Sequence, residues 1–386
     1  MDFSYPAEVE QFRTELRDWL SANLTDELVA ARRPTGRDDA AFEMLRVWNA
    51  TMADAGWAAV SWPREYGGRG ATVLEQLVYT EETTRARAPM PLNVIGLNNI
   101  APAIMQYGTE SQKRTLLPRM MRADDIWCQG MSEPEAGSDL AALRTRAVRD
   151  GDDFVVNGQK IWTSLGHRAD WCQLYVRTDP EAPKHKGISC LIVDMRLPGI
   201  EARPLVTLNG DADFAEVFFH DVRVPADALL GPLNGGWQVA TTTLSHERAG
   251  AARLYAEMQV RLEELVKDLA AAPGGDALDD PVTLRRLGEI AVRIKYLEVL
   301  CQRSISATLH GGPEMVAFGS ASLAKTVWGE IGQDLAALAY DVLGTQGDGA
   351  PWANYRLTSR SLTIAGGTSQ INKNITAQRV LGLPRQ

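Results

Sequence analysis

Apolar residues recur at helical spacing through the first third of the chain. The first predicted helix carries one apolar stripe, made of Val9, Phe12, Leu16, Trp19 and Leu20. A second helix is predicted from about residue 40 to residue 55, where Gly56 stops it. Two later helices begin at capping boxes, residues 72–75 and 109–112, where a Thr is followed three residues later by Glu or Gln. These signals predict an all-helical N-terminal domain over residues 1–125.

Near Trp127 the apolar pattern changes to short runs rich in β-branched and aromatic residues. The predicted strands cover residues 154–156, 171–176, 188–193 and 216–224. Turn-forming pairs separate them, among them Asp150-Gly151 and Asn157-Gly158. Strands do not alternate with helices, which disfavours a doubly wound parallel sheet. We therefore expect a compact antiparallel β domain over residues 126–233.

Helical spacing returns after Gly235. The predicted helices cover about residues 237–269, 281–310 and 317–343, and a last helix ends near Gly382. A Pro-Gly-Gly sequence at residues 273–275 separates the first two. The pattern predicts a C-terminal helical domain over residues 234–386, and the order of helix, β and helix places the chain in the α+β class.

Composition and charge exclude several classes of function. The 386 residues are 45% apolar and 23% charged, which is ordinary for a soluble globular protein. A net charge of −9 without a basic track argues against a nucleic-acid binder. No apolar run approaches the ~20 residues that span a bilayer, and the N-terminus has no signal peptide pattern. Four scattered cysteines suit a reducing cytoplasm, and five dispersed histidines offer no metal-ligand spacing.

Candidate chemistry begins at residues 127–142, with the sequence WCQGMSEPEAGSDLAA. We expect a loop here, in which Gly137 lets the backbone approach a flat or anionic ligand closely. The hydroxyls of Ser132 and Ser138 add hydrogen-bond donors. A Gly-Ser-Asp sequence alone is more often a plain turn, but a second stretch follows at residues 157–164, with the sequence NGQKIWTS.

These two stretches, together with the sequence Gly-Thr-Ser-Gln at residues 367–370, resemble the motifs of the acyl-CoA dehydrogenase family of flavoproteins. The resemblance covers essentially the whole chain in the expected order. It implies a β domain held between two helical domains and an FAD cofactor. The implied reaction is α,β-desaturation of an acyl-CoA, in which a base removes the α proton and the flavin accepts the β hydrogen as hydride. Electrons would then pass to an electron-transferring flavoprotein.

The resemblance also indicates where the base lies. In many members a Glu stands immediately before the Gly-Thr of the C-terminal motif, but here Gly366 holds that position. The branch that includes the isovaleryl-CoA dehydrogenases carries a Glu-Arg pair on the first long C-terminal helix, which matches Glu247 and Arg248. Gly250 and Ala251 follow Glu247 by three and four residues and leave room for a ligand. An arbitrary Glu-Arg pair is usually a solvated surface couple, but the missing carboxylate at Gly366 favours Glu247 as the base.

Further site residues follow from their positions in the family motifs. The implied cofactor-binding residues are Gln129, Met131, Ser132, Gly137, Trp162, Thr163, Ser164, Thr368 and Gln370. Trp162 would cover a face of the flavin ring and Ser164 would donate to its redox-active edge, although a strand Trp taken alone is more often a core residue. The substrate side would include Ser138, Arg248 and Gly366, and no metal is implied.

Two motifs of homomeric relatives are altered here. The Arg-x-x-Phe-Gly motif, which reaches a neighbour's FAD, is replaced at residues 272–280 by a segment with three aspartates, and these cannot cradle a pyrophosphate. The Gln-x-x-Gly-Gly-x-Gly loop survives only at residues 341–347, with Asp341 in place of the Gln. We therefore expect the catalytic subunit of an α2β2 heterotetramer with a related subunit, similar to those of bacterial steroid side-chain degradation. A homotetramer is the alternative.

The small residues at 365–367 predict a branched or bulky acyl group, with sterol-derived chains among the candidates. The alternatives are a homotetrameric dehydrogenase for short branched chains, a flavin oxidase or monooxygenase on the same fold, and a non-catalytic partner subunit. Such a subunit should have lost Ser132, Trp162 and Glu247, and all three are present.

Overall fold

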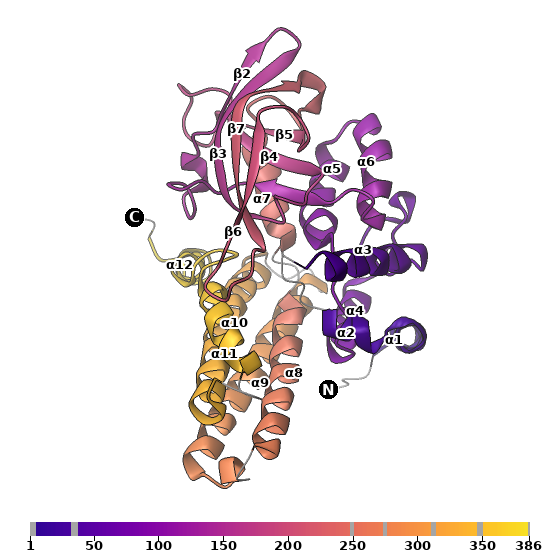
Figure 1. Cartoon of the computed structure of the whole chain (residues 1–386), viewed down its shortest axis with the longest axis vertical. Helices are drawn as coiled ribbons and strands as arrows, with labels where there is room; N and C mark the ends of the chain where they lie inside the picture. Colours follow the sequence, from indigo (N-terminus) through magenta and orange to yellow (C-terminus); the bar gives the residue numbers. More distant parts are fainter. Residues whose placement is uncertain are drawn as a thin grey trace. The chain divides into compact units, whose positions relative to one another are not determined.

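The structure is a computed structural model that describes residues 5–31, 38–247, 251–272, 276–309, 314–345 and 350–384. Contacts between residues divide the chain into two units (Figure 1). The helical unit comprises Met1–Asn23, Thr72–Ala88 and Arg248–Gln386. The sheet unit comprises Leu24–Ala71 and Pro89–Glu247. The predicted domain boundaries at residues 125 and 233 stay a prediction.

The helical unit contains the long C-terminal helices and two helices from the N-terminal third. Its α-helices are α1 (Ala7–Asn23), α4 (Val73–Arg85), α8 (Ala251–Ala271), α9 (Pro281–Leu309), α10 (Glu314–Leu343), α11 (Ala350–Thr358) and α12 (Ser369–Arg379). Figure 1 shows α8, α9 and α10 side by side, and their apolar faces form one buried core. The short helices η6 (Asp276–Leu278) and η8 (Ser359–Thr363) lie in the connections.

A buried carboxylate helps to hold α1 against α4. The side chain of Glu82 on α4 is buried, and it accepts hydrogen bonds from Arg13 Nη1 at 2.8 Å and from Arg17 Nε at 2.7 Å. The predicted apolar stripe of α1 is confirmed, with Val9, Phe12 and Leu16 among its buried residues. Apolar burial and this ion-pair cluster therefore explain why a segment from the start of the chain packs with helices from its end.

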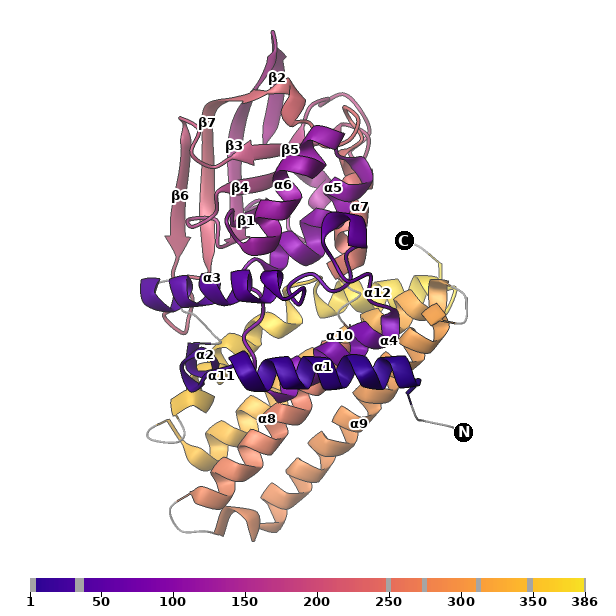
Figure 2. The same ribbon diagram turned by 90° about the vertical axis from the view of Figure 1, so that its right-hand side faces the viewer.

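The helices of the sheet unit are α2 (Asp26–Ala31), α3 (Asp39–Asp54), α5 (Ala101–Tyr107), α6 (Glu110–Arg122) and α7 (Gly236–Glu247), with the short turns η1 (Arg64–Tyr66), η2 (Gly96–Ile100), η3 (Leu140–Ala142) and η4 (Ala226–Ala228). Of these, α3, α6 and α7 begin close to the predicted positions, whereas α2 and α5 were not predicted. The capping boxes at Thr72 of α4 and Thr109 of α6 are both present, with reciprocal hydrogen bonds between side chain and backbone. Helices α5, α6 and α7 lie on one side of the sheet (Figure 2).

One seven-stranded sheet forms the rest of this unit. The strands are β1 (Trp127–Gly130), β2 (Arg146–Asp150), β3 (Asp153–Ser164), β4 (Trp171–Arg177), β5 (Ile188–Asp194), β6 (Ile200–Leu205) and β7 (Phe214–Pro225). Their order is β1-β4-β2-β3-β7-β6, with β5 paired to β4. Most pairs are antiparallel, as predicted, but β1 runs parallel to β4 and β2 meets β4 in a short parallel contact.

The sheet differs from the sequence prediction at β3. The pair Asn157-Gly158 was expected to be a turn, which is wrong, because β3 continues through it to Ser164. A Cβ atom at position 158 would lie 2.5 Å from Thr145 Oγ1, so this glycine permits a close approach between chain segments. The turn predicted at Gly151 is confirmed between β2 and β3. Strands β1, β2 and β6 were not predicted, and β1 occupies the start of the expected loop.

The C-terminal helices follow the predicted order. The helix expected over residues 237–269 is described as α7 and α8, and residues 248–250 between them lie outside the described residues. α9 and α10 match the next two predictions to within a few residues, whereas α11 is an additional short helix before α12. None of the helices that the structure describes is both long and apolar enough to cross a membrane.

Candidate functional site

The first signature segment passes from a buried strand to an open loop. β1 pairs in register with β4, including Gln129 with Gln173, and the chain then turns at Glu133–Ala136, where the two backbones exchange hydrogen bonds of 3.1 Å. Gln129, Met131 and Ser132 are half-buried, and Gly137 and Ser138 are exposed. This segment therefore presents a strip of partly accessible backbone and side chains on the sheet unit.

A buried ion pair, which the sequence analysis did not predict, holds this segment in place. Lys160 on β3 is fully buried, and its Nζ donates to Glu133 Oε1 at 2.8 Å and to the backbone oxygen of Met131 at 3.1 Å. Glu133 also accepts from the backbone nitrogens of Arg144 at 2.6 Å and Thr145 at 2.8 Å. The pair thus joins both ends of the loop to β3.

Burial and pairing act in opposite directions on these two groups. Burial alone would raise the pKa of Glu133, but the Lys160 ammonium and the bound backbone N–H groups outweigh it and lower that pKa below the ordinary value. Burial lowers the pKa of Lys160, against the opposing effect of Glu133. A buried charge of this kind is strongly destabilising when its partner is removed.

Trp162 lies in a β-bulge rather than in the core. The register between β3 and β7 shifts between Lys160 and Thr163, where β3 carries one extra residue. Trp162 has a left-handed φ of 59°, which is unusual for a bulky residue, and 56% of its surface is exposed. Its ring meets Phe214 edge-on, with centroids 5.8 Å apart. The bulge therefore turns a large aromatic face outward, next to the signature loop.

The residues after Trp162 take different environments. Thr163 is buried, and its hydroxyl has no hydrogen-bond partner within the described part of the chain. Ser164 is half-buried on the same side as Trp162. The backbone nitrogen of Ile161 donates to the backbone oxygen of Ser132 at 2.9 Å, which joins the two signature segments directly. The structure therefore places Met131 and Ser132 beside the part of β3 that leads into Trp162.

In the sequence, the predicted base is the last residue of the sheet unit. Helix α7 belongs to the sheet unit and its last residue is Glu247, whereas the last segment of the helical unit begins at Arg248. The side chain of Glu247 and the whole of Arg248 lie outside the described residues. The backbone that carries Glu247 therefore belongs to the same unit as Ser132 and Trp162.

The C-terminal motif belongs to the helical unit. Gly366 and Gly367 have left-handed φ values of 64° and 87°. The hydroxyl of Thr368 caps α12 by accepting from the backbone nitrogen of Ile371 at 3.2 Å, and Gln370 is exposed. The backbone oxygen of Gly367 accepts from Lys325 Nζ at 2.8 Å. A side chain at position 366 would have to adopt a conformation that costs roughly 1–2 kcal/mol, so the backbone itself disfavours a glutamate there.

Two acids that replace the family's usual residues are occupied by contacts within the helical unit. Asp280 caps α9, accepting from the backbone nitrogen of Thr283 at 2.9 Å and from its hydroxyl at 2.8 Å. Asp341 on α10 accepts from Arg286 Nη1 at 3.0 Å and also lies 3.8 Å from an Arg356 nitrogen. Asp280 therefore stabilises the start of α9, and Asp341 links α10 to α9 and to α11.

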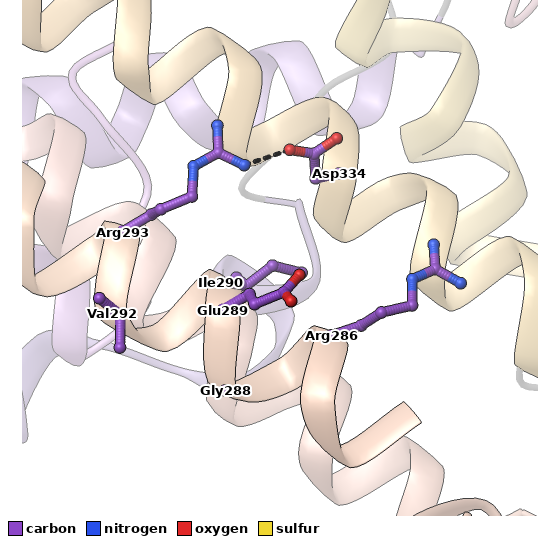
Figure 3. A pocket seen from close by; sticks show the side chains of 7 residues that line it. All are labelled: Arg286, Gly288, Glu289, Ile290, Val292, Arg293 and Asp334. Atoms are coloured by element: carbon purple, nitrogen blue, oxygen red, sulfur yellow. Dashed lines mark hydrogen bonds and ion pairs between the residues drawn. The ribbon is translucent and has the colours of Figure 1, made fainter. Parts of the chain in front are cut away.

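A surface pocket on α9 and α10 contains none of the predicted site residues (Figure 3). Its lining consists of Arg286, Gly288, Glu289, Ile290, Val292, Arg293 and Asp334. Arg293 is bound to Asp334, as the dashed line in Figure 3 shows, and Arg286 is bound to Asp341. Both arginines are thus paired, and the candidate site remains on the segments described above.

Sequence models of three domains of one family match most of the chain. The model of the acyl-CoA dehydrogenase N-terminal domain matches residues 6–124, that of the middle domain residues 128–222, and that of the C-terminal domain residues 234–381. The chain belongs to the acyl-CoA dehydrogenase family. The predicted family and the order of helical, β and helical segments are therefore confirmed, and the protein is an acyl-CoA dehydrogenase.

Individual relatives match over the full length. Acyl-CoA dehydrogenase IpdE1 from Mycobacterium tuberculosis (strain ATCC 25618 / H37Rv) is 39% identical over 391 residues, which cover 98% of this chain and 99% of that protein. Among solved structures, the Tcur3481-Tcur3483 steroid ACAD has a TM-score of 0.87 at 33% identity, and 100% of both chains is covered. The ChsE4-ChsE5 complex from Mycobacterium tuberculosis has a TM-score of 0.85 at 35% identity, again over 100% of both chains.

Proposed function

We propose that this acyl-CoA dehydrogenase uses FAD to introduce an α,β double bond into a branched or bulky acyl-CoA, of the kind found in sterol side chains, with Glu247 as the base. One observation carries the proposal. The backbone at Gly366 is unsuited to a glutamate, and the alternative carboxylate ends a helix of the unit that holds both flavin-facing signature segments.

The residues of the sheet unit fit a flat flavin ring. Trp162 offers an exposed aromatic face of the kind that stacks on a planar ligand. The hydroxyls of Ser132 and Ser164 have no hydrogen-bond partner among the described residues, so both are free to bind the polar edge of a ring. When bound, the flavin supplies the hydride acceptor for the β hydrogen.

The remaining predicted residues would take supporting roles. Gln129 and Met131 would line the ring beside Ser132, and the backbone at Gly137 and Thr163 belongs to the same two segments. Thr368 and Gln370, at the start of α12, would meet the flavin or its phosphates. Ser138 would contact the CoA arm, Arg248 would steady the substrate, and Gly366 would leave room for the acyl group.

The role of Glu247 is to take the α proton. This proton is weakly acidic even beside a thioester, so the carboxylate must lie within hydrogen-bond reach of it in a site that excludes water. Placing the base on α7 leaves only small residues at positions 365–367. That arrangement favours substituents on the acyl chain that a glutamate at position 366 would obstruct.

Anaerobic titration of the FAD-loaded protein with a panel of acyl-CoAs tests the base assignment. In Glu247→Gln we expect the rate of flavin bleaching to fall about 10²- to 10⁴-fold, the usual contribution of a positioned base. Acyl-CoA binding, measured from the flavin spectral shift, should change much less. Glu263→Gln, the same change at an exposed position of α8, is the matched control. Unimpaired reduction of Glu247→Gln would disprove the assignment.

We also propose that the chain assembles as an α2β2 heterotetramer with a related subunit and passes electrons to an electron-transferring flavoprotein. The aspartates at 280 and 341 support this, because Asp280 caps its own helix, Asp341 pairs with Arg286 of α9, and neither can bind a neighbour's pyrophosphate. A similar protein was solved as the ChsE4-ChsE5 complex, and another is a steroid ACAD. The cytoplasmic location expected from the sequence stays a prediction.

Purification from the native host tests the assembly. We expect a second, related chain to co-purify in equal amount, with fewer than one FAD per chain. A homotetramer with one FAD per chain would contradict the heterotetramer.

The same acyl-CoA panel tests the substrate class. Faster flavin reduction by unbranched butyryl-CoA than by branched acyl-CoAs would contradict the proposed preference for branched or bulky acyl groups.

A further inference from the structure

A hydrogen-bonded series of polar side chains crosses the sheet unit from η2 to α7. It begins at Asn99 of η2, passes Gln129 of β1 and Gln173 of β4, and reaches Thr243 of α7 and Tyr175 of β4. Gln173, Thr243 and Tyr175 are fully buried. Buried polar side chains of this kind are stable only when each is hydrogen-bonded. This hydrogen-bonded series therefore fixes the strands and the helix against one another.

In the hydrogen-bonded series, each amide donates to the next side chain toward α7. Asn99 Nδ2 donates to Gln129 Oε1 at 3.3 Å, and Gln129 Nε2 donates to Gln173 Oε1 at 3.2 Å. Gln173 Nε2 then donates to Thr243 Oγ1 at 3.3 Å, and that hydroxyl lies 3.3 Å from the phenol of Tyr175. Thr243 is therefore the point at which the helix is tied to the strand next to β1.

The start of α7 is attached to the sheet independently. Just before the helix, the backbone nitrogen of Asn234 donates to the hydroxyl of Ser189 on β5 at 2.8 Å, and Ser189 is fully buried. Thr243 lies seven residues into the helix, and Glu247 follows it by four residues, which is about one helical turn or 6 Å. The hydroxyl of Thr243 is thus the polar attachment nearest to the predicted base among the described side chains of α7.

We propose that Gln173 and Thr243 are positioning residues that set where the end of α7 holds Glu247 relative to the segment that follows Gln129. The inference rests on the proposed function, because it assigns a consequence to the placement of Glu247. An error of about 1 Å in the placement of a catalytic group can cost ~10²-fold in rate. A hydrogen-bonded tie one turn from the base is well placed to prevent such an error.

Thr243→Val tests the proposal, because it removes the hydroxyl and keeps the branched shape. In the FAD-loaded enzyme we expect the rate of flavin reduction at saturating acyl-CoA to fall about 10- to 100-fold. The dissociation constant for acyl-CoA, the flavin absorbance spectrum and the FAD content should remain as in the wild type. Such a split between rate and binding distinguishes a positioning role from general damage to the fold.

Two variants control the measurement. Thr241→Val makes the same change on the same helix, but Thr241 is exposed and its hydroxyl donates to the helix's own Trp237 oxygen at 2.8 Å. It should reduce at the wild-type rate. Thr243→Ser keeps the hydroxyl and should restore most of the rate lost in Thr243→Val.

Combination with Glu247→Gln gives the decisive comparison. If Thr243 acts through Glu247, adding Thr243→Val to Glu247→Gln should produce little further loss, whereas independent effects would multiply. A multiplicative loss overturns the proposal, and so does a Thr243→Val enzyme as fast as Thr241→Val. Normal reduction by Glu247→Gln alone would instead show that the base assignment is wrong.

Gln173→Met provides a second route should Thr243→Val not fold. It removes the side-chain amide from the hydrogen-bonded series, keeps the side-chain length and leaves Thr243 its contact with Tyr175. For Gln173→Met we expect the same loss of rate as for Thr243→Val, without loss of acyl-CoA binding. Adding Gln173→Met to Glu247→Gln should likewise cause little further loss of rate. Wild-type reduction by a folded Gln173→Met enzyme would overturn the proposal.

Discussion

Two lysines perform a similar task in the two units, in different environments. Lys160 in the sheet unit donates to the backbone oxygen of Met131 at 3.1 Å, and Lys325 in the helical unit donates to that of Gly367 at 2.8 Å. Each thereby holds a segment that we expect to meet the flavin. Lys160 is fully buried and pairs with a buried carboxylate, whereas Lys325 is only half-buried.

The difference shows how much each segment depends on its lysine. Without Lys160, Glu133 would remain buried without its ion-pair partner. Without Lys325, the Gly367 oxygen would still accept from Asn372 Nδ2 at 2.8 Å. The signature loop of the sheet unit therefore contains a buried charge that needs its cation, in addition to its backbone hydrogen bonds, whereas the Gly367 oxygen keeps a second side-chain donor.

Lys160→Met should have the largest effect. It leaves Glu133 without its partner, and breaking a buried pair in this way typically costs ~3–5 kcal/mol of stability. Urea denaturation of the FAD-free protein at neutral pH measures the loss. Lys184→Met is the control, because its pair with Asp139 is exposed and should contribute about 0–1 kcal/mol. Equal losses in the two variants would contradict the comparison.

Lys325→Met should have a smaller effect on the same measurement. A hydrogen bond from a charged donor contributes about 1.5–3 kcal/mol, and the remaining bond from Asn372 places this variant at the lower end. FAD content after purification should fall less than in Lys160→Met. A loss as large as that of Lys160→Met would show that the helical unit has no second support for this motif.

Gly366→Ala tests the backbone conformation at the expected position of the family's usual base. A left-handed φ costs an alanine roughly 1–2 kcal/mol, so this variant should be less stable by about that amount. Gly288→Ala is the opposite control, because Gly288 lies inside α9 and no atom lies within 4 Å of the added methyl group. It should stabilise by up to about 1 kcal/mol.

Acidification should produce the smallest effect, through Glu133. Its pKa in the folded protein lies below the ordinary value of 4.5, so its contribution to stability is present above about that pH and is lost as the pH falls further. Glu133→Gln should lack this part of the pH dependence. In Lys160→Met burial is opposed only by the remaining hydrogen bonds to Glu133, so its pKa should rise relative to the wild type and this part of the pH dependence should shrink. Stability measured between pH 3 and pH 6, about the range where carboxylates titrate, tests both expectations.

Local signals predicted the helices well. The capping boxes at Thr72 and Thr109 need only four consecutive residues, and both are confirmed. The strands were harder to predict because their pattern depends on neighbours. β2 and β6 are short and largely exposed, so they lack the apolar runs that mark a strand. Asn157-Gly158 has the composition of a turn, but Asn157 pairs with Arg146 of β2 and Gly158 with Phe219 of β7, which keeps both inside β3.

The candidate site was only partly predictable from the sequence. The family motifs pointed to Ser132, Trp162 and their neighbours, and those assignments stay predictions. The motifs gave no indication of the Lys160–Glu133 pair, because the two residues lie 27 positions apart and each taken alone resembles a solvated surface residue. Only the folded sheet brings them together. The Gln173–Thr243 bond, between residues 70 positions apart, was hidden for the same reason.

The bulge at Trp162 decides which side chains of β3 face outward. Before it, the buried side chains include Phe154, Val156 and Lys160, all at even positions, and after it the buried side chain is Thr163. Uninterrupted alternation would turn Trp162 and Ser164 inward and expose Thr163. Loss of one residue at this point would therefore reverse which side chains face outward in the rest of the strand, while leaving its composition almost unchanged. A homologue that is one residue shorter here should be examined for an exposed aromatic side chain before it is assumed to bind the same ring.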